Sequence, residues 1–211
     1  MDRIEKLCSY LSPCKTFADV GCDHGYCTLY ALKNGLCESA VVSDISEKCL
    51  DKARVLLDKF VRAGAVTAKC CFGMEEIEPD TEQVLIAGMG GDEITDILKN
   101  SFIPHKFVLQ PMKNPRAVRE YLLKNGAAIE RDEIFESGGK FYFVIKGCRA
   151  GKGLTYSEAQ LEYCHDTKSV AAQKFLKQEL NKKYEYLARP LGDAARAEIE
   201  GQARLIRGVL K

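Results

Sequence analysis

The stretch Ala127–Lys146 reads AAIERDEIFESGGKFYFVIK and decides how the sheet of this protein is completed. Its two apolar, strand-like runs, Ala127–Phe135 and Lys140–Lys146, are joined only by the four residues Glu136–Gly139. Parallel neighbours need a crossover of about a dozen residues or more, whereas antiparallel neighbours can be joined by a tight glycine-containing turn. The stretch therefore predicts an antiparallel β-hairpin.

The chain before this hairpin alternates between strands and helices. Segments with helical spacing, notably Ser46–Val61 and Gly91–Leu98, separate short apolar runs, and this alternation predicts an α/β fold with a parallel sheet. Such a sheet closed by a terminal antiparallel hairpin is the layout of the Rossmann-like class I S-adenosylmethionine-dependent methyltransferase fold, and the hairpin distinguishes it from nucleotide-binding dehydrogenases. The five predicted parallel strands are Thr16–Val20, Ala40–Ser43, Val66–Cys71, Gln83–Ala87 and Lys106–Gln110.

Beyond a glycine-rich joint at Arg149–Gly153 the pattern becomes helical. Two apolar stripes with helical spacing lie on either side of a break at Pro190–Asp193, which predicts a coiled hairpin of two antiparallel helices. We therefore divide the chain into a methyltransferase-like domain, 1–150, and a helical appendage, 151–211, and we expect Leu154–Cys164 to lean on the domain. The stripes are Leu176, Leu180, Tyr184 and Leu187, followed by Ile199, Ala203, Ile206 and Leu210.

The composition is that of a protein with a full hydrophobic core. Of 211 residues 46% are hydrophobic, the longest apolar runs are too short to span a membrane, and the first residues lack a secretory pattern. We therefore expect a cytoplasmic protein, and we expect it to be a monomer. The ten cysteines include no C-x-x-C pair and mostly occupy apolar segments, so we predict reduced core residues rather than metal ligands.

The net charge of +1 conceals a difference between the two parts of the chain. Residues 151–211 carry 11 Lys and Arg against 8 Asp and Glu, whereas residues 1–150 carry 20 against 22. A polyanionic partner would bind the appendage, although a solvated helix surface would show the same mild excess.

The turn after the first predicted strand indicates the kind of ligand. Ligands of doubly wound sheets bind beyond the carboxyl ends of the strands, where Gly21–Tyr26 has G-x-x-x-G rather than G-x-G-x-x-G spacing. Asp23 stands where a diphosphate cradle needs glycine, and its carboxylate would repel phosphate. The same carboxylate would attract ammonium and sulfonium charge, which favours S-adenosylmethionine over NAD.

Three further strand ends supply candidate binding groups. Asp44 can accept hydrogen bonds from both ribose hydroxyls, although a lone acid there would serve equally well as a helix N-cap. Glycines in Ile86–Gly91 leave room for a flat base, although Gly90 and Gly91 also suit the start of a helix. Gln110, followed by Pro111, offers an amide to the edge of a base.

The motifs DVGCDHGY, IAGMGG and LQP, placed in this order at three strand ends, are similar to those of the TrmK family. These bacterial methyltransferases modify N1 of the adenine at tRNA position 22. The resemblance spans Met1–Lys146, continues into the helical appendage, and implies S-adenosylmethionine as cofactor and tRNA as partner. Because N1 lies on the Watson–Crick edge, the resemblance also implies that the target base leaves its pairing partner.

The strand-end analysis and the resemblance together assign the site residues. Adenine N1 already carries a free lone pair, so we expect Asp23 to stabilise developing positive charge and His24 to orient groups or contact RNA rather than act as a general base. The expected catalytic residues are Asp23, His24, Gly88, Met89, Gln110 and Pro111. The expected cofactor-binding residues are Asp19, Gly21, Cys22, Asp23, Gly25, Asp44, Ile45, Phe72, Gly73, Gly88, Met89 and Gly90.

Two positions depart from the family pattern. Phe72 replaces the Asp of a Gly-Asp-Gly motif, where stacking could substitute for a hydrogen bond, and Met112 replaces the Asn of Gln-Pro-Asn, a loss that Asn114 could offset. These departures leave open a methyltransferase for another RNA, a protein or a small molecule, and a non-catalytic RNA-binding relative. The expected phosphate contacts of the appendage are Lys174, Lys177, Lys182, Lys183, Arg189, Arg196, Arg204 and Arg207.

Overall fold

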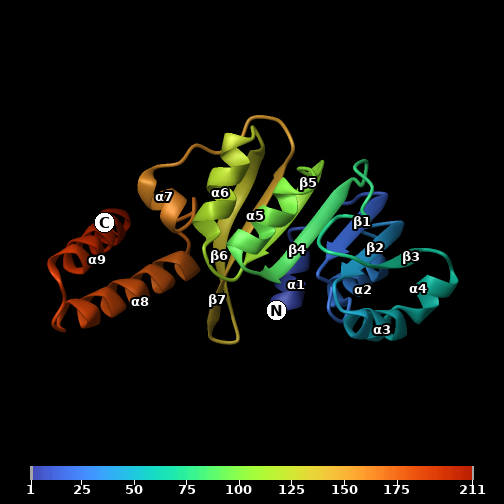
Figure 1. Ribbon diagram of the computed structural model, residues 1–211, viewed down its shortest axis with the longest axis horizontal. Coiled ribbons are helices and arrows are strands. Elements are labelled where there is room, and N and C mark those ends of the chain that lie inside the picture. Colours follow the sequence, from blue (N-terminus) through green and yellow to red (C-terminus); the bar gives the residue numbers. More distant parts are fainter. Residues whose placement is uncertain (1, 211) are drawn as a thin grey trace.

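The computed structural model describes residues 2–210, and within them seven strands form one sheet in the order β3-β2-β1-β4-β5-β7-β6 (Figure 1). The first five strands in the chain pair in parallel, and β7 runs antiparallel to both of its neighbours. The predicted class I methyltransferase fold is therefore confirmed. The strands are β1 (Thr16–Val20), β2 (Ser39–Asp44), β3 (Val66–Cys70), β4 (Gln83–Met89), β5 (Lys106–Pro111), β6 (Ala128–Ser137) and β7 (Lys140–Cys148).

The β6–β7 hairpin is tighter than the sequence suggests. Ser137 pairs directly with Lys140, so the turn consists of Gly138 and Gly139 rather than of four residues. Both glycines have positive φ, 57° and 73°, which suits a two-residue turn that follows the twist of the strands. The predicted connection was too long because Glu136 and Ser137 continue the β6 ladder.

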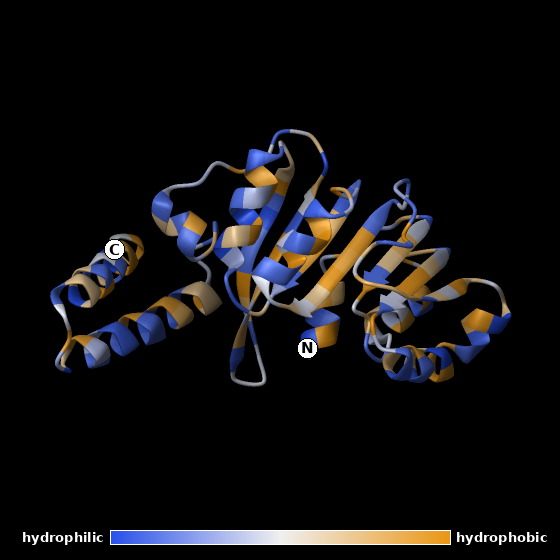
Figure 2. Cartoon of the chain, viewed as in Figure 1, coloured by the Kyte–Doolittle hydropathy of each residue, from blue (hydrophilic) through white to orange (hydrophobic). Residues whose placement is uncertain are grey.

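Helices cover both faces of the sheet. Alternate strand residues point to opposite faces, so Leu85 packs with Leu7 and Leu50 on one side, whereas Ile86 packs with Ile94 on the other. The orange strands of Figure 2 mark this buried layer. The helices are α1 (Arg3–Cys8), α2 (Tyr26–Lys33), α3 (Glu47–Leu56), α4 (Asp58–Arg62), α5 (Gly91–Lys99) and α6 (Pro115–Lys124).

The helix predicted at Ser46–Val61 is two helices in the structure. Leu57 leaves the helical conformation at φ −98° and ψ 9°, and the chain bends there between α3 and α4. The bend buries Leu57 completely and lets Phe60 and Val61 pack against the same core from α4. Burial of Leu57 and the packing of Phe60 and Val61 therefore override the continuous helical pattern.

The C-terminal residues form α7 (Glu158–Glu162), α8 (Val170–Leu187) and α9 (Asp193–Val209). Helices α8 and α9 pack against each other as a helical hairpin beside the sheet (Figure 1). Leu176 and Ile206 are fully buried where α8 and α9 meet, whereas Tyr184, farther along the stripe, is exposed. The base of α8 packs on the β6–β7 hairpin through Phe175, whose ring meets the edges of Phe141 and Phe143 at centroid distances of 5.5 and 5.4 Å.

A fully buried ion pair ties this C-terminal part to the sheet. Arg119 on α6 donates to Asp132 on β6 through Nε (2.7 Å) and Nη2 (3.0 Å), and it donates as well to the carbonyl oxygens of Leu161 and Tyr163. Asp132 accepts a further hydrogen bond from the Tyr156 hydroxyl (2.9 Å).

Within residues 2–210 no helix is long and apolar enough to cross a membrane.

Candidate functional site

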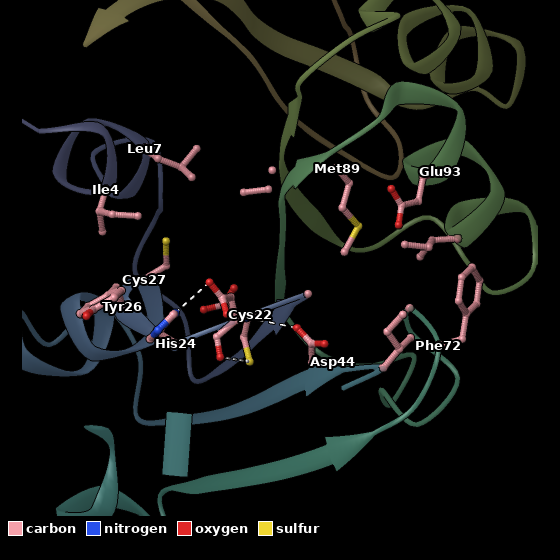
Figure 3. A pocket seen from close by; sticks show the side chains of 18 of the residues that line it. Ile4, Leu7, Cys22, His24, Tyr26, Cys27, Asp44, Phe72, Met89 and Glu93 are labelled. Carbon is pink, nitrogen blue, oxygen red and sulfur yellow. Dashed lines mark hydrogen bonds and ion pairs between the residues drawn. The ribbon is translucent and has the colours of Figure 1, made fainter. Parts of the chain in front are cut away.

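A cavity of about 440 Å³ opens at the carboxyl ends of β1 and β4 (Figure 3). These two strands are neighbours in the sheet, and the chain continues from β1 toward β2 on one side and from β4 toward β5 on the other. This is the switch point at which open α/β sheets bind ligands. Most residues predicted from the strand ends line it, namely Asp19, Gly21, Cys22, Asp23, His24, Asp44, Ile45, Phe72, Gly73, Gly88 and Met89.

The turn after β1 exposes backbone to the cavity. Gly21 (φ 68°), Asp23 (φ 46°) and Gly25 (φ 75°) all have left-handed conformations, and the N–H groups of Gly21 and Cys22 donate to the Ser43 carbonyl oxygen. A Cβ atom at Gly21 would lie 2.0 Å from Cε of Met89. The left-handed conformation therefore favours glycine at position 21, and a side chain there would have to displace the end of Met89.

The carboxylate of Asp23 is held by two neighbouring side chains. His24 Nδ1 lies 2.8 Å from Asp23 Oδ2, and Lys52 Nζ lies 3.8 Å from Oδ1. Partial burial raises the pKa of Asp23, but hydrogen bonds from His24 and Cys49 and the charges of His24 and Lys52 outweigh this and lower its net pKa. Asp23 is therefore ionised near neutral pH and held in place at the edge of the cavity.

Asp19 is the most buried acid of the site, with 4% of its surface exposed. Its Oδ2 accepts hydrogen bonds from the Thr28 backbone N–H (3.2 Å) and hydroxyl (2.8 Å). Burial raises the pKa of Asp19 to about 6, the negative charge of Asp44 adds to this, and the Thr28 hydrogen bonds oppose it. The carboxyl group of Asp19 can therefore gain or lose its proton near pH 6.

Asp44 ends β2 with both oxygens anchored. Oδ1 accepts from the Ser46 N–H (2.9 Å) and Oδ2 from the Asp23 N–H (3.2 Å), so Asp44 joins the turn after β1 to the turn after β2. The N-cap of α3 is Ser46, whose hydroxyl accepts from the Cys49 N–H. The alternative role of Asp44 as a helix cap is therefore wrong, and the carboxylate faces the cavity.

Replacing Asp44 by Ala is expected to weaken binding of a ribose-containing cofactor by about 1–3 kcal/mol, because two ribose hydroxyls would lose their acceptor. Isothermal titration with S-adenosylhomocysteine measures this change. An unchanged dissociation constant would exclude the ribose role, and a circular dichroism spectrum like that of the unmodified protein would show that the variant is folded.

The two ends of the cavity differ in character. Phe72 lies at one end, and Ile4 and Leu7 lie at the other, with Asp44 and Cys22 between them (Figure 3). Phe72 is 41% exposed, so its side chain is accessible for stacking against a flat ring.

Gln110 and Pro111, predicted to be catalytic, do not line the cavity. Gln110 is fully buried behind it, where its Oε1 accepts from Arg3 Nη2 (2.6 Å) and its Nε2 lies 3.3 Å from Met112 Sδ. Asn114 caps α6 and donates to Asp92 (2.7 Å), so its amide is already engaged and does not replace the one lost at Met112.

Two predicted cofactor-binding glycines also lie outside the cavity wall. Gly25 precedes α2 and packs against α3, where an added Cβ would lie 3.3 Å from Ala53 Cβ. Gly90 is the N-cap of α5, which begins at Gly91. The helix-start interpretation of Gly90 and Gly91 therefore holds, while Gly88 and Met89 before them line the cavity.

Helices α1 and α5 also contribute to the site, which the motifs at the strand ends did not predict. Arg3, Ile4 and Leu7 reach the cavity from α1, and Glu93 reaches it from α5. The capping box of Asp2 and Glu5 around the start of α1 was a readable signal for a helix.

No group of three or more potential ligands placed to hold a metal ion occurs in the described part of the chain.

Comparison with known proteins agrees with this geometry. A family model described as a methyltransferase domain matches residues 1–145. A protein of Mycoplasma pneumoniae, provisionally named as a tRNA methyltransferase, is 30% identical over 158 residues, which cover 74% of this chain and 70% of that protein. This chain belongs to the TrmK family of methyltransferases.

Two further comparisons describe its place in the TrmK family. The tRNA (adenine(22)-N(1))-methyltransferase of Bacillus subtilis is 28% identical over 164 residues, covering 75% of this chain and 69% of that protein. The structure of M. capricolum TrmK in complex with S-adenosylhomocysteine superposes with a TM-score of 0.90 at 20% identity, covering 99% of this chain and 98% of that one. The second likeness extends the shared fold to the C-terminal helices.

The cavity of this TrmK-family chain fits S-adenosylmethionine by the chemistry of its lining. Asp19 and Asp23 would face the ammonium and sulfonium charges, Asp44 would accept from the ribose, and Phe72 would stack on the adenine. Gly21, which lines the cavity, has no side chain to occupy the space that the ligand would take. This cofactor supplies an electrophilic methyl group when it is bound.

Cofactor affinity is expected to rise with pH through about 6. The raised pKa means that the folded protein holds the Asp19 proton more tightly than the unfolded chain does. Ionisation of Asp19 therefore lowers the stability of the folded protein above pH 6, and this loss of stability disappears as the pH falls. A cationic cofactor requires the ionised form, so affinity at pH 5 should be about tenfold lower than at pH 7. Titration calorimetry across this range, with Asp19→Asn as the variant that flattens the dependence, tests the assignment.

Proposed function

We propose that this protein transfers a methyl group from S-adenosylmethionine to N1 of the adenine at position 22 of tRNA. The acid-lined cavity at the switch point supports this most directly, because it suits a cationic methyl donor. The names of the Mycoplasma pneumoniae and Bacillus subtilis relatives support a tRNA substrate, and the second of them supports adenine 22. Exposed apolar side chains near the strand ends, Tyr26 and Met112, offer contacts to an unpaired base.

Methyl transfer to adenine N1 requires the protein to align the base with the methyl group and to stabilise the positive charge that develops on the base. Adenine N1 holds its lone pair in the plane of the ring and is unprotonated at neutral pH, so no general base is needed. As N1 bonds to the methyl carbon, positive charge develops on the adenine ring. The ionised Asp23 carboxylate at the cavity edge would stabilise this charge, and preorganisation by its neighbours would make that stabilisation effective.

His24 then acts as a positioning residue. Its Nδ1 contacts Asp23, and its ring stacks on Tyr26 with a centroid distance of 5.6 Å and an interplanar angle of 19°. This arrangement favours the orienting role over general base catalysis, because the nitrogen nearest the acid is already engaged.

We propose that the C-terminal helices hold the tRNA by its backbone. Among the candidate cations, Lys174 pairs with Glu136 and Lys182 with Glu179, each at 2.6 Å, and Arg196 lies 4.0 Å from Glu200. Arg189 stacks over the Tyr186 ring. The remaining candidates make no ion pair within residues 2–210 and are free to contact phosphates; they are Lys177, Lys183, Arg204 and Arg207.

A triple variant, Lys177→Gln, Lys183→Gln and Arg207→Gln, is expected to weaken tRNA binding and to reduce its salt dependence. Each lost phosphate contact should lower the slope of log K against log salt by about 0.7–0.9. Filter binding over a salt series measures this, with Lys174→Gln, which removes a paired lysine, as the comparison. Equal slopes for the triple variant and the unmodified protein would place the RNA elsewhere.

These substitutions test the appendage more cleanly than deletion of residues 151–211. Deletion would remove Tyr156 and the carbonyl groups of Leu161 and Tyr163, which satisfy the buried Arg119–Asp132 pair. The remaining domain would be destabilised for a reason unrelated to RNA binding.

The proposed function is tested by incubating the protein with labelled S-adenosylmethionine and unmodified bacterial tRNA, followed by mapping of the product. Label on N1 of adenine 22 is expected. Transfer to another nucleotide or molecule would favour a methyltransferase of different specificity, for which Phe72 and Met112 would be the altered recognition residues. Cofactor binding without transfer would favour a non-catalytic RNA-binding relative.

A further inference from the structure

A second groove lies beside the cofactor cavity and shares two residues with it. His24 and Tyr26, at the turn that leads into α2, line both the cavity and this groove. The opposite wall is α3, which contributes Lys48, Lys52 and Val55. The groove has a volume of about 530 Å³, within the range of pockets that hold small ligands.

The charge of the groove is opposite to that of the acid-lined cavity. Lys48 and Lys52 are four residues apart in α3 and therefore lie on one face of the helix. Lys48 is exposed and makes no ion pair within residues 2–210. Asp51 in the same wall is already paired with Arg54 (2.9 Å), so the unpaired charge of the wall is positive. The groove therefore suits an anionic group, whereas the cavity suits a cationic one.

The groove also offers an aromatic and an aliphatic side chain to a ligand. Tyr26 is 52% exposed and stacks with His24 at a centroid distance of 5.6 Å. Val55 is 79% exposed and lies about one helical turn beyond Lys52. Accessible rings beside lysines are the combination that binds an unstacked base together with its phosphate.

The position of the groove indicates which nucleotide it would hold. Asp23, the proposed stabiliser of charge on the target adenine, contacts His24 (2.8 Å) and Lys52 (3.8 Å), and both of these residues line the groove. The groove therefore begins beside the reacting base. A base that is turned out of its pair also loses its stacking on the neighbouring bases. The adjacent nucleotide, joined to the target by one phosphate, lies within reach of the groove.

We propose that this groove binds a nucleotide next to the target adenine, with its base against Tyr26 and Val55 and its phosphate at Lys48. The inference rests on the proposed tRNA substrate. It gives the tRNA a contact on the methyltransferase domain, in addition to the phosphate contacts proposed for the C-terminal helices.

The experiment measures the tRNA affinity of two groove variants by filter binding. Lys48→Gln should lower the slope of log K against log salt by about 0.7–0.9, the effect of one lost phosphate contact. Val55→Asp puts a carboxylate where the base would lie and should weaken binding of tRNA by about 5- to 100-fold, the effect of losing one stacked base. Lys59→Gln is the matched control, because it removes an exposed lysine of α4 that does not line the groove.

Two further substrates separate a contact to the base from a contact to the phosphate. These are tRNAs with an abasic nucleotide directly before or directly after the target adenine. One of them should bind the unmodified protein about 5- to 100-fold more weakly than intact tRNA does. The same base removal should cost Val55→Asp much less, because that variant has already lost the contact. An equal loss for both proteins would overturn the inference.

Two other results would also overturn it. Unchanged tRNA affinity of both groove variants would assign the groove to another partner, such as a protein. Weaker binding of S-adenosylhomocysteine by either variant would mean that the substitution distorts the cofactor cavity, which neither residue lines. Binding and methylation of tRNA by the unmodified protein are measured first, and their absence would overturn the proposed function as well.

Discussion

Replacing Asp23 by Asn is expected to slow methyl transfer by about 10²–10³-fold, the usual effect of removing one preorganised group that stabilises transition-state charge. The substitution keeps the size of the side chain and removes its negative charge. Binding of tRNA should change little, because its phosphates would be held by the appendage. Single-turnover transfer of a labelled methyl group, at saturating cofactor, measures the effect on the chemical step.

Asp51→Asn is the matched control for this prediction. Asp51 lies on the neighbouring helix α3, pairs with Arg54 at 2.9 Å, and does not line the cavity. A rate for Asp23→Asn equal to that of the control would remove Asp23 from the mechanism and leave alignment alone to account for catalysis.

Replacing Asp132 by Ala is expected to lower the free energy of unfolding by about 3–5 kcal/mol. Both partners of the Arg119–Asp132 pair have fully buried side chains, so the variant leaves an uncompensated guanidinium in the protein interior. It also removes the acceptor for Tyr156 and loosens the segment that leads to α8. Urea unfolding followed by circular dichroism measures the loss.

Two comparison variants separate the buried charge from other causes. Glu120→Ala breaks the exposed Arg116–Glu120 pair and should cost less than about 1 kcal/mol. The double variant Arg119→Met, Asp132→Leu should recover much of the stability lost in Asp132→Ala, because no buried charge remains unpaired. A loss below about 1 kcal/mol for Asp132→Ala would mean that the pair does not anchor the C-terminal segment.

The sheet and one side of the cavity could be predicted because they follow from local rules. The two-glycine turn at Gly138 and Gly139 forces an antiparallel hairpin, and parallel strands necessarily bring the turns after Val20 and Asp44 to the same edge. The hydrogen bond from the Asp23 N–H to the Asp44 carboxylate joins these two turns.

The other side of the cavity could not be predicted, because it depends on contacts between distant parts of the chain. Arg3 and Gln110 are 107 positions apart and meet only when α1 folds across the end of the sheet. Gln110 looked like a base-recognition residue because it ends β5, yet its neighbours bury it completely. Spacing along the sequence locates strand ends but does not show which side chains are covered.

The central claim is that the acid-lined cavity at the β1–β4 switch point selects a cationic thioether-type cofactor and rejects diphosphates. Titration calorimetry of the unmodified protein with S-adenosylmethionine and, separately, with NADH tests this directly. The expected result is saturable binding of S-adenosylmethionine and no binding of NADH, since Asp23 stands where a diphosphate would lie. Binding of NADH with no binding of S-adenosylmethionine would contradict the claim.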